Sequence, residues 1–168
     1  KLSLEPELLQ KAADKLADAN HVVILAEGGS GTIARAAYDI FLKLAIPCRI
    51  VDDIMFQIME ISMMDENDVL FLILNSGRTY NVLQNASYAK QRGTKGTPLS
   101  KYLDIELPTC IFSSSYLSDI SAARLCELVT VSILHSIMAL TRDSEQMKRG
   151  ERIANSIELK RIPGNQKF

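Results

Sequence analysis

The chain has 168 residues, of which 47% are hydrophobic and 23% charged, and this balance predicts one folded domain and excludes a wholly disordered chain. Its 19 basic and 20 acidic residues give a net charge of -1, which excludes electrostatic binding of nucleic acid or of an acidic membrane by this chain alone. The apolar runs are shorter than the roughly 18 residues that a bilayer span requires, so we predict no membrane-spanning segment.

The three cysteines, Cys48, Cys110 and Cys126, are far apart in the sequence and lie in apolar contexts. An odd number of separated cysteines is typical of reduced, buried thiols, which favours a cytoplasmic protein. His21 and His135 are isolated, and no Cys or His pair has the close spacing of a zinc site. We therefore predict neither a metal ion nor a cofactor.

Helical patterns and short apolar runs alternate through the first half of the chain. The apolar runs are uniform, which is typical of strands buried on both faces of a parallel sheet. We predict helices over 6–20, 32–44, 54–64 and 80–91, and strands over 21–26, 48–51 and 69–74. This alternation builds right-handed parallel crossovers, so the predicted fold is α/β, a three-layer α/β/α sandwich with an open parallel sheet.

The second half departs from this alternation. A fourth apolar strand is expected after Gly93, but the sequence passes directly from Lys95 to Gly96 and a short helical turn. Loss of a strand would leave helix faces uncovered, so we expect that residues are missing between Lys95 and Gly96; deletion of the strand is the alternative. Beyond this point we predict a short strand over 104–107, a long helix that is apolar nearly all round over 116–141, and a polar helix over 143–159.

Two polar loops that contain glycine follow the first and third predicted strands. They are Glu27-Gly28-Gly29-Ser30-Gly31 and Asn75-Ser76-Gly77-Arg78-Thr79. Each opens a helix at the carboxyl edge of the sheet, where ligands bind in open α/β folds. Glycines let a ligand approach the backbone and helix-start N–H groups attract anions, so the pair predicts a cradle for the phosphate of a small polar molecule. For either loop alone, the alternative is a tight turn with a capping Ser.

The same residues carry a resemblance to a known family. Ser76-Gly77-Arg78-Thr79 after a buried strand resembles the Ser-Gly-x-Thr signature of SIS (sugar isomerase) domains, and Gly28-Gly29-Ser30-Gly31 resembles their first phosphate-side loop. The segment over 97–105 is similar to the family's Ser-Pro-Leu-Ala-x-x-Ala-Asp stretch. The likeness runs from about Leu8 to Thr141 and is greatest to the C-terminal effector domain of RpiR-type transcriptional regulators.

This resemblance implies one SIS domain over residues 1–168, with a flavodoxin-like Rossmannoid fold that holds no nucleotide. The sugar-phosphate ligand residues that it implies are Gly29, Ser30, Asn75, Ser76, Arg78 and Thr79. A solvated helix-start position is the alternative for Arg78, because a cation is not favoured there. The family usually has a polar residue where this chain has Leu74, so one expected hydrogen bond to the ligand is missing. RpiR-type regulators carry an N-terminal helix-turn-helix domain, and the start at Lys1 without a Met is expected of a fragment that lacks it.

Three functions remain open from the sequence. We predict a phosphosugar sensor, because the binding loops are present and no acid–base pair for aldose–ketose isomerisation is evident, so no catalytic residue is assigned. For an isomerase, the candidate bases are Glu127, which can equally be a surface charge, Glu27 beside the first loop, and His135 among apolar residues. An assembly module with a degenerate pocket is the third hypothesis, which Leu74 supports.

The long helix also predicts a homodimer. Val131, Leu134 and Met138 form one apolar stripe and Leu125 lies on another, although a helix over a sheet needs only one. The surplus predicts contact with a second copy; the alternative is cover by the helix over 143–159. A charge at Leu134 is then expected to dissociate the dimer or to unfold the chain. DNA binding is expected only through the absent N-terminal domain.

Overall fold

The computed structural model describes residues 4–74, 84, 87, 95–96, 104–109 and 117–159, with the backbone alone for 95–96 and 117–121. The second predicted loop and most of the helix expected over 80–91 lie outside these residues. In chain order the elements are α1 (Pro6–Ala17), β1 (Val22–Ala26), the 3-10 turn η1 (Gly28–Ser30), α2 (Gly31–Lys43), β2 (Cys48–Ile50), α3 (Ile54–Met63), β3 (Val69–Ile73), β4 (Lys95–Gly96), α5 (Leu117–Leu140) and α6 (Ser144–Glu158).

β1 and β3 lie side by side at the centre of a parallel sheet with the strand order β2-β1-β3-β4. Val22 pairs with Val69 at the start of the two strands, and Ala26 pairs with Ile73 at their ends. Every residue of both strands is buried, as expected of apolar runs that are covered on both faces. The predicted parallel α/β sheet is therefore confirmed.

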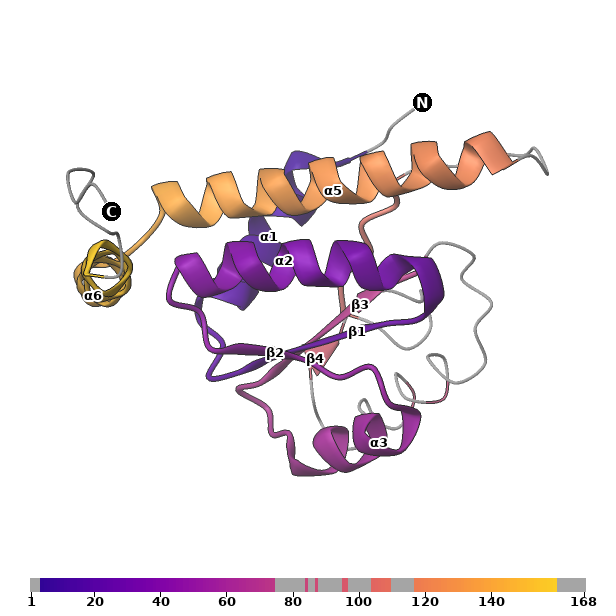
Figure 1. Ribbon diagram of the computed structural model, residues 1–168, viewed down its shortest axis with the longest axis horizontal. Helices are drawn as coiled ribbons and strands as arrows, with labels where there is room; N and C mark the ends of the chain where they lie inside the picture. Colours follow the sequence, from indigo (N-terminus) through magenta and orange to yellow (C-terminus); the bar gives the residue numbers. More distant parts are fainter. Residues whose placement is uncertain are drawn as a thin grey trace, which may run out of the picture.

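Helices cover both faces of this sheet and make the predicted three-layer α/β/α sandwich (Figure 1). On the face that carries α1, α2 and α5, the fully buried Phe41 meets Phe71 edge to face, with 5.5 Å between the ring centroids. On the opposite face, Ile61 of α3 packs in a second core cluster with Leu25 and Leu70. The sheet thus separates two apolar cores.

α3 covers the second face of the sheet and begins at an aspartate that caps it. Asp53 accepts hydrogen bonds from the backbone N–H groups of Met55 (2.8 Å) and Phe56 (3.1 Å), which satisfies two donors that a helix start leaves unpaired. Gln57 and Ile61 are fully buried toward the sheet, whereas Met55 and Phe56 are exposed. One side of α3 therefore holds it beneath the central strands.

The segment over 104–109 does not form the strand predicted within it. It is irregular, although Ile105 is only 2% exposed and belongs to the larger core cluster, against which Leu107 also packs. Two apolar side chains anchor the segment without a ladder of backbone hydrogen bonds, so the alternating pattern did not require a strand. β4 consists of Lys95 and Gly96 alone, paired with the start of β3. The omission of residues between Lys95 and Gly96 stays a prediction.

α5 has one face in the core and one face exposed. Val131, Leu134 and Met138 are at most 3% exposed and belong to the core cluster beneath it, whereas Leu125 is 64% and Val129 is 51% exposed. Leu134 is thus a core residue, and a charge there would unfold the chain rather than report on a dimer. Two apolar stripes are present, as the sequence predicted.

By length and composition alone, the window Ala122–Leu140 of α5 would suffice to cross a membrane, although the sequence analysis expected no such segment. It is the one such window in the part of the chain that the structure describes. Its inner face packs over α1 and α2, which is the position of a core helix in an α/β sandwich.

α6 is held to the body of the domain at its first turn. The Gln146 side chain donates to the Ala17 carbonyl at the end of α1 (3.1 Å), and Arg142 donates to the Lys43 carbonyl at the end of α2 (3.3 Å). Asp143 and Gln146 form a capping box that starts the helix. Beyond this turn α6 has no buried residue and crosses the end of α5, where Figure 1 shows it along its axis. It therefore leaves the outward face of α5 uncovered.

Candidate functional site

The first predicted ligand loop leaves the carboxyl end of β1 and turns directly into α2. Gly28 has a φ of +56°, in the left-handed region that favours glycine, and η1 runs on into α2 at Gly31. Ser30 is 5% exposed and stands at the N-cap position, but within the described residues its hydroxyl makes no capping hydrogen bond to α2. The alternative of a turn with a capping Ser is therefore not what the structure shows.

The second predicted loop follows the neighbouring strand. Its residues Asn75, Ser76, Arg78 and Thr79 lie outside the described part of the chain. β3 pairs in parallel with β1 to the last residue of each strand, so both strands end at the same edge of the sheet. Leu74, the first residue after β3, is half-buried and packs against the core cluster beneath the sheet. The topology thus starts both loops at neighbouring positions of the edge where α/β folds bind ligands.

Arg124 of α5 lies against the first loop, which sequence reasoning missed. Its guanidinium occupies the space that a β-carbon on Gly29 would fill, so glycine at this position lets the arginine approach the backbone. A guanidinium presents N–H donors in a planar fork that matches phosphate and carboxylate oxygens. A signal was available, because Arg124 and Glu127 are the only charged residues between positions 122 and 140.

Glu127, one turn further along α5, is buried and is not a surface charge. It is 6% exposed, and its Oε2 atom has no hydrogen-bond partner among the described residues. Burial raises the pKa of this carboxyl above its ordinary value, and the positive charge of Arg124 acts in the opposite direction. Glu27 beside the first loop also has a buried carboxyl oxygen, Oε1, that lacks a partner in the described part. Such atoms are rare in folded proteins, so both carboxyls are candidates to meet a ligand.

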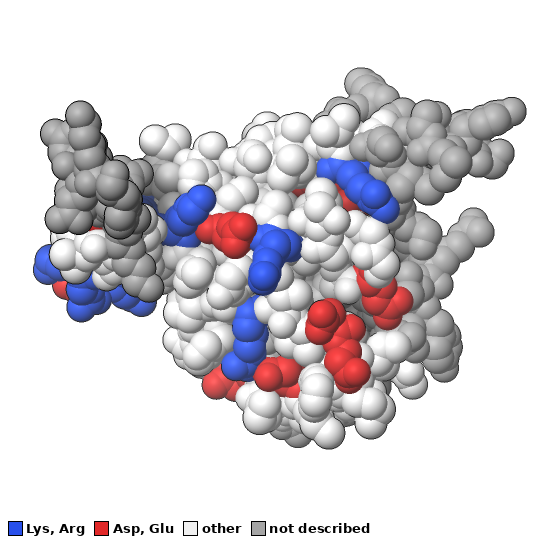
Figure 2. Space-filling model, viewed as in Figure 1, with Lys and Arg blue, Asp and Glu red and all other residues white. Residues whose placement is uncertain are grey.

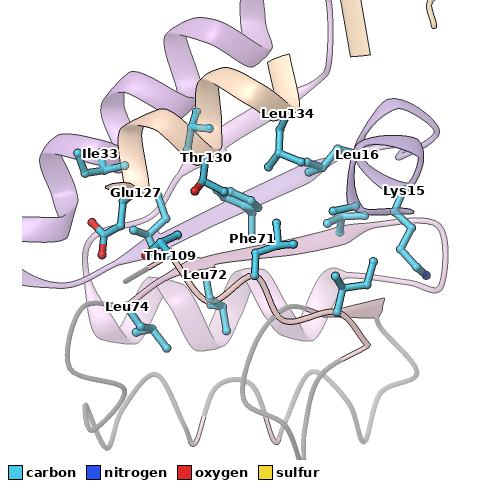
Figure 3. Close-up of a pocket in the computed structure, with 16 residues that line it drawn as sticks. Lys15, Leu16, Ile33, Phe71, Leu72, Leu74, Thr109, Glu127, Thr130 and Leu134 are labelled. Carbon is cyan, nitrogen blue, oxygen red and sulfur yellow. The ribbon is translucent and has the colours of Figure 1, made fainter. Parts of the chain in front are cut away.

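A narrow cavity of about 90 Å³ runs beneath α5 along β3. Figure 3 shows Lys15 of α1 at one end and Glu127, Thr109 and Leu74 toward the other. Most of the side chains between these ends are apolar, among them Leu16, Ile33, Phe71, Ile105, Val131 and Leu134. Of the candidate bases from the sequence, Glu127 lines the cavity, whereas Glu27 and His135 do not.

These features define a class of protein before any relative is considered. A parallel sheet whose two central strands end at the same edge, each followed in the sequence by a glycine-bearing loop, is the architecture of open α/β domains, in which this edge is the usual ligand site. Residues 15–101, just over half of the chain, match the family model of the SIS domain. The chain therefore belongs to the SIS domain family.

Two curated relatives of this chain are longer transcriptional regulators. An uncharacterized HTH-type transcriptional regulator of Caldanaerobacter subterraneus is 26% identical over 167 residues, which cover 95% of this chain and 59% of that protein. The HTH-type transcriptional regulator HexR of Escherichia coli is 24% identical over 167 residues, which cover 95% of this chain and 58% of HexR. The chain thus spans somewhat under three fifths of the length of these two relatives.

Solved structures share the fold. The NanR protein of Vibrio vulnificus, complexed with ManNAc-6P, has a TM-score of 0.85 at 16% identity, covering 96% of this chain and 64% of that one. The sugar isomerase domain of an RpiR transcription factor from Sphaerobacter thermophilus has a TM-score of 0.74 at 14% identity, covering 93% of this chain and 88% of that one. A hypothetical protein of Methanococcus jannaschii, for which a 3-hexulose-6-phosphate isomerase function was inferred, has a TM-score of 0.64 at 23% identity. The match covers 85% of this chain and 84% of that one.

The placement of Arg124 predicts the effect of Gly29→Ala. The added β-carbon displaces the guanidinium, which removes the positive charge that lowers the pKa of Glu127, so this pKa is expected to rise further. Titration of the Glu127 carboxyl carbon by NMR measures the change. Gly31→Ala is the matched control, because a β-carbon at Gly31 meets nothing within 4 Å. The same Glu127 titration in both variants would show that Arg124 does not rest on the loop.

The burial of Glu127 predicts how stability depends on pH. Because its pKa is raised in the folded state, the folded protein holds this proton more tightly than the unfolded chain above the ordinary value of 4.5. The free energy of unfolding should therefore fall as the pH rises from that value through the raised pKa. Urea denaturation between pH 4 and pH 8 should show a weaker decline in Glu127→Gln, whereas Glu151→Gln, at an exposed position of α6, should match the parent. Equal slopes in all three proteins would mean that the Glu127 carboxyl is solvated.

Proposed function

We propose that this chain is the effector domain of a transcriptional regulator of carbohydrate metabolism and that it binds a sugar phosphate. The observation that carries the proposal is the parallel pairing of β1 with β3, which starts two loops rich in glycine and hydroxyl groups at one edge of the sheet. The regulator relatives support the role, and the NanR structure, which shares the fold, holds a phosphorylated sugar.

The phosphate is expected between the two loops. Backbone N–H groups at the start of α2 and side-chain hydroxyls from both loops are neutral donors, which suit a phosphate anion. Arg124 adds a cation from α5 above Gly29. The residues proposed to hold the ligand are Gly29, Ser30, Asn75, Ser76, Arg78 and Thr79.

The relatives support a longer protein with a DNA-binding segment. Both are HTH-type regulators longer than this chain, which supports a DNA-binding helix-turn-helix segment outside residues 1–168, with those residues forming one SIS domain. The near-neutral charge of this chain agrees with DNA contact through that segment alone. Such a regulator acts in the cytoplasm, where the separated cysteines stay reduced.

A sugar-phosphate isomerase is the second candidate, and the burial of Glu127 is the observation that favours it. Aldose–ketose isomerisation needs a general base whose pKa is tuned toward neutral, and burial raises the pKa of this carboxyl in that direction. Turnover of a bound sugar phosphate that is lost in Glu127→Gln would identify an enzyme. Binding without turnover identifies a sensor, and a failure to bind any sugar phosphate identifies an assembly module.

We also propose that two copies of this domain pair through the outward face of α5. Leu125 and Val129 are exposed on it, and Ser132 and Ser136 are small enough to let a second helix approach closely. Figure 2 shows that the surface along α5, at the top of the view, carries few charged side chains. An uncharged apolar helix face of this length is typical of an interface between subunits.

The loop assignment predicts the effect of Ser76→Ala on ligand binding. Loss of one hydrogen bond from a hydroxyl to a charged phosphate costs about 1.5–3 kcal/mol, so the affinity for a sugar phosphate should fall about tenfold or more. Calorimetric titration measures the affinity, and thermal unfolding should be nearly unchanged. Ser156→Ala, at an exposed position of α6, is the control. An affinity equal to that of the parent would move the phosphate away from the second loop.

The proposed interface predicts that Val129→Glu dissociates the dimer, because two buried carboxylates would face each other across a twofold axis. Sedimentation velocity at micromolar concentration should show a dimer for the parent and a monomer for the variant. Ile157→Glu is the matched control, since Ile157 is 50% exposed on α6, away from this face. A parent that sediments as a monomer would rule the interface out.

A further inference from the structure

We infer that the apolar cavity at Glu127 is a subsite for an acyl group, so that the domain prefers an acylamino sugar phosphate to a fully hydroxylated one. This inference rests on the proposed function, because the two loops supply the phosphate anchor. It adds a second recognition element, built from α5 and β3, that distinguishes among phosphorylated sugars.

The cavity walls do not match a polyol. Ile33, Phe71, Ile105, Val131 and Leu134 present carbon atoms to the space beneath α5. A sugar hydroxyl that is buried there without a partner loses its hydrogen bonds to water, at a cost of about 1–3 kcal/mol. The cavity volume of about 90 Å³ is sufficient for a small substituent such as an acetyl group.

Glu127 places a hydrogen-bond acceptor beside these apolar walls, and Lys15 and Thr109 also line the cavity. Glu127 is 6% exposed, and its Oε2 atom has no partner within the described part of the chain. Thr130, which also lines the cavity, already donates its hydroxyl proton to the Cys126 carbonyl at 2.9 Å. An acylamino group meets both features at once, because its N–H donates to the carboxyl while its methyl group enters the apolar walls.

Leu74 relates the cavity to the second ligand loop. It is the first residue after β3, directly precedes that loop, and lies toward the Glu127 end of the cavity in Figure 3. Its side chain packs against the core cluster on the α3 face of the sheet, so it is not a wall of the acyl subsite. Glu127 and the apolar side chains of α5 and β3 therefore favour a ligand with one amide donor beside an apolar carbon.

The test compares ligands that differ only at one substituent. Calorimetric titration of the full chain uses N-acetylglucosamine 6-phosphate, glucosamine 6-phosphate and glucose 6-phosphate, the matching mannose series, and inorganic phosphate. In at least one series the acetylated sugar phosphate is expected to bind at least tenfold more tightly than its amine and hydroxyl counterparts. Glu127→Gln should reduce this preference severalfold, because a neutral amide is a weaker acceptor than a carboxylate, whereas Met147→Gln, at an exposed position of α6, should preserve it.

Each other outcome overturns the inference in a distinguishable way. Equal affinity for all the sugar phosphates, with each tighter than inorganic phosphate, removes the subsite and leaves the proposed function intact. Tighter binding of the free amine would mean that Glu127 recognises a positive charge, and the acyl subsite would be wrong. Retention of the full acetyl preference in Glu127→Gln would place the subsite elsewhere. Failure of every sugar phosphate to bind removes the proposed function as well.

Discussion

Burial of β1 and β3 on both faces is the constraint on which the rest of the structure depends. A strand that is covered above and below exposes no polar side chain along its length, so polar chemistry is confined to the residues beyond its ends. The two strands run in parallel and pair to their last residues, Ala26 and Ile73, so their carboxyl ends coincide. The glycine-bearing loops therefore start at one edge, and α5 lies over that arrangement as part of the same core.

The elements that the sequence predicted correctly are those with a repeating physical signature. The apolar runs that became β1, β2 and β3 and the helical periods of α1, α2 and α3 depend on near neighbours in the chain. The strand predicted over 104–107 failed, because two apolar side chains, Ile105 and Leu107, bury equally well from irregular backbone. Short segments have too few residues for the periodicity to distinguish these cases.

The site could be predicted in part, for a related reason. Ser30 and Gly29 belong to a local motif, and the structure shows them in a turn into α2, as expected. Arg124 and Glu127 meet the site only through the packing of α5 on the sheet, nearly a hundred residues beyond that motif. Their burial depends on which face of α5 turns inward, and a helix that is apolar nearly all round does not reveal this. The same ambiguity left open whether a charge at Leu134 would break a dimer or the core, and the structure places Leu134 in the interior.

α5 therefore has three structural roles, in the core, at the candidate site and on the surface. Its inner stripe completes the core, its first turns bring a guanidinium and a carboxyl to the carboxyl edge of the sheet, and its outer stripe stays exposed. These roles occupy different sides or different turns, so a substitution at one position of α5 does not automatically disturb the others. Val129 and Val131 are two residues apart, yet one is exposed and the other is buried.

α2 connects the first ligand loop to a residue that precedes α6. It starts directly after the loop at Ser30, and the carbonyl of its last residue, Lys43, holds Arg142 at the root of α6. Thirteen residues of helix make a rod about 20 Å long, stiff along its axis. The first ligand loop and the root of α6 are therefore held at a constant separation. The contact from Gln146 to the Ala17 carbonyl ties the same root to α1, so the position of α6 is set by two helices that both pack on the sheet.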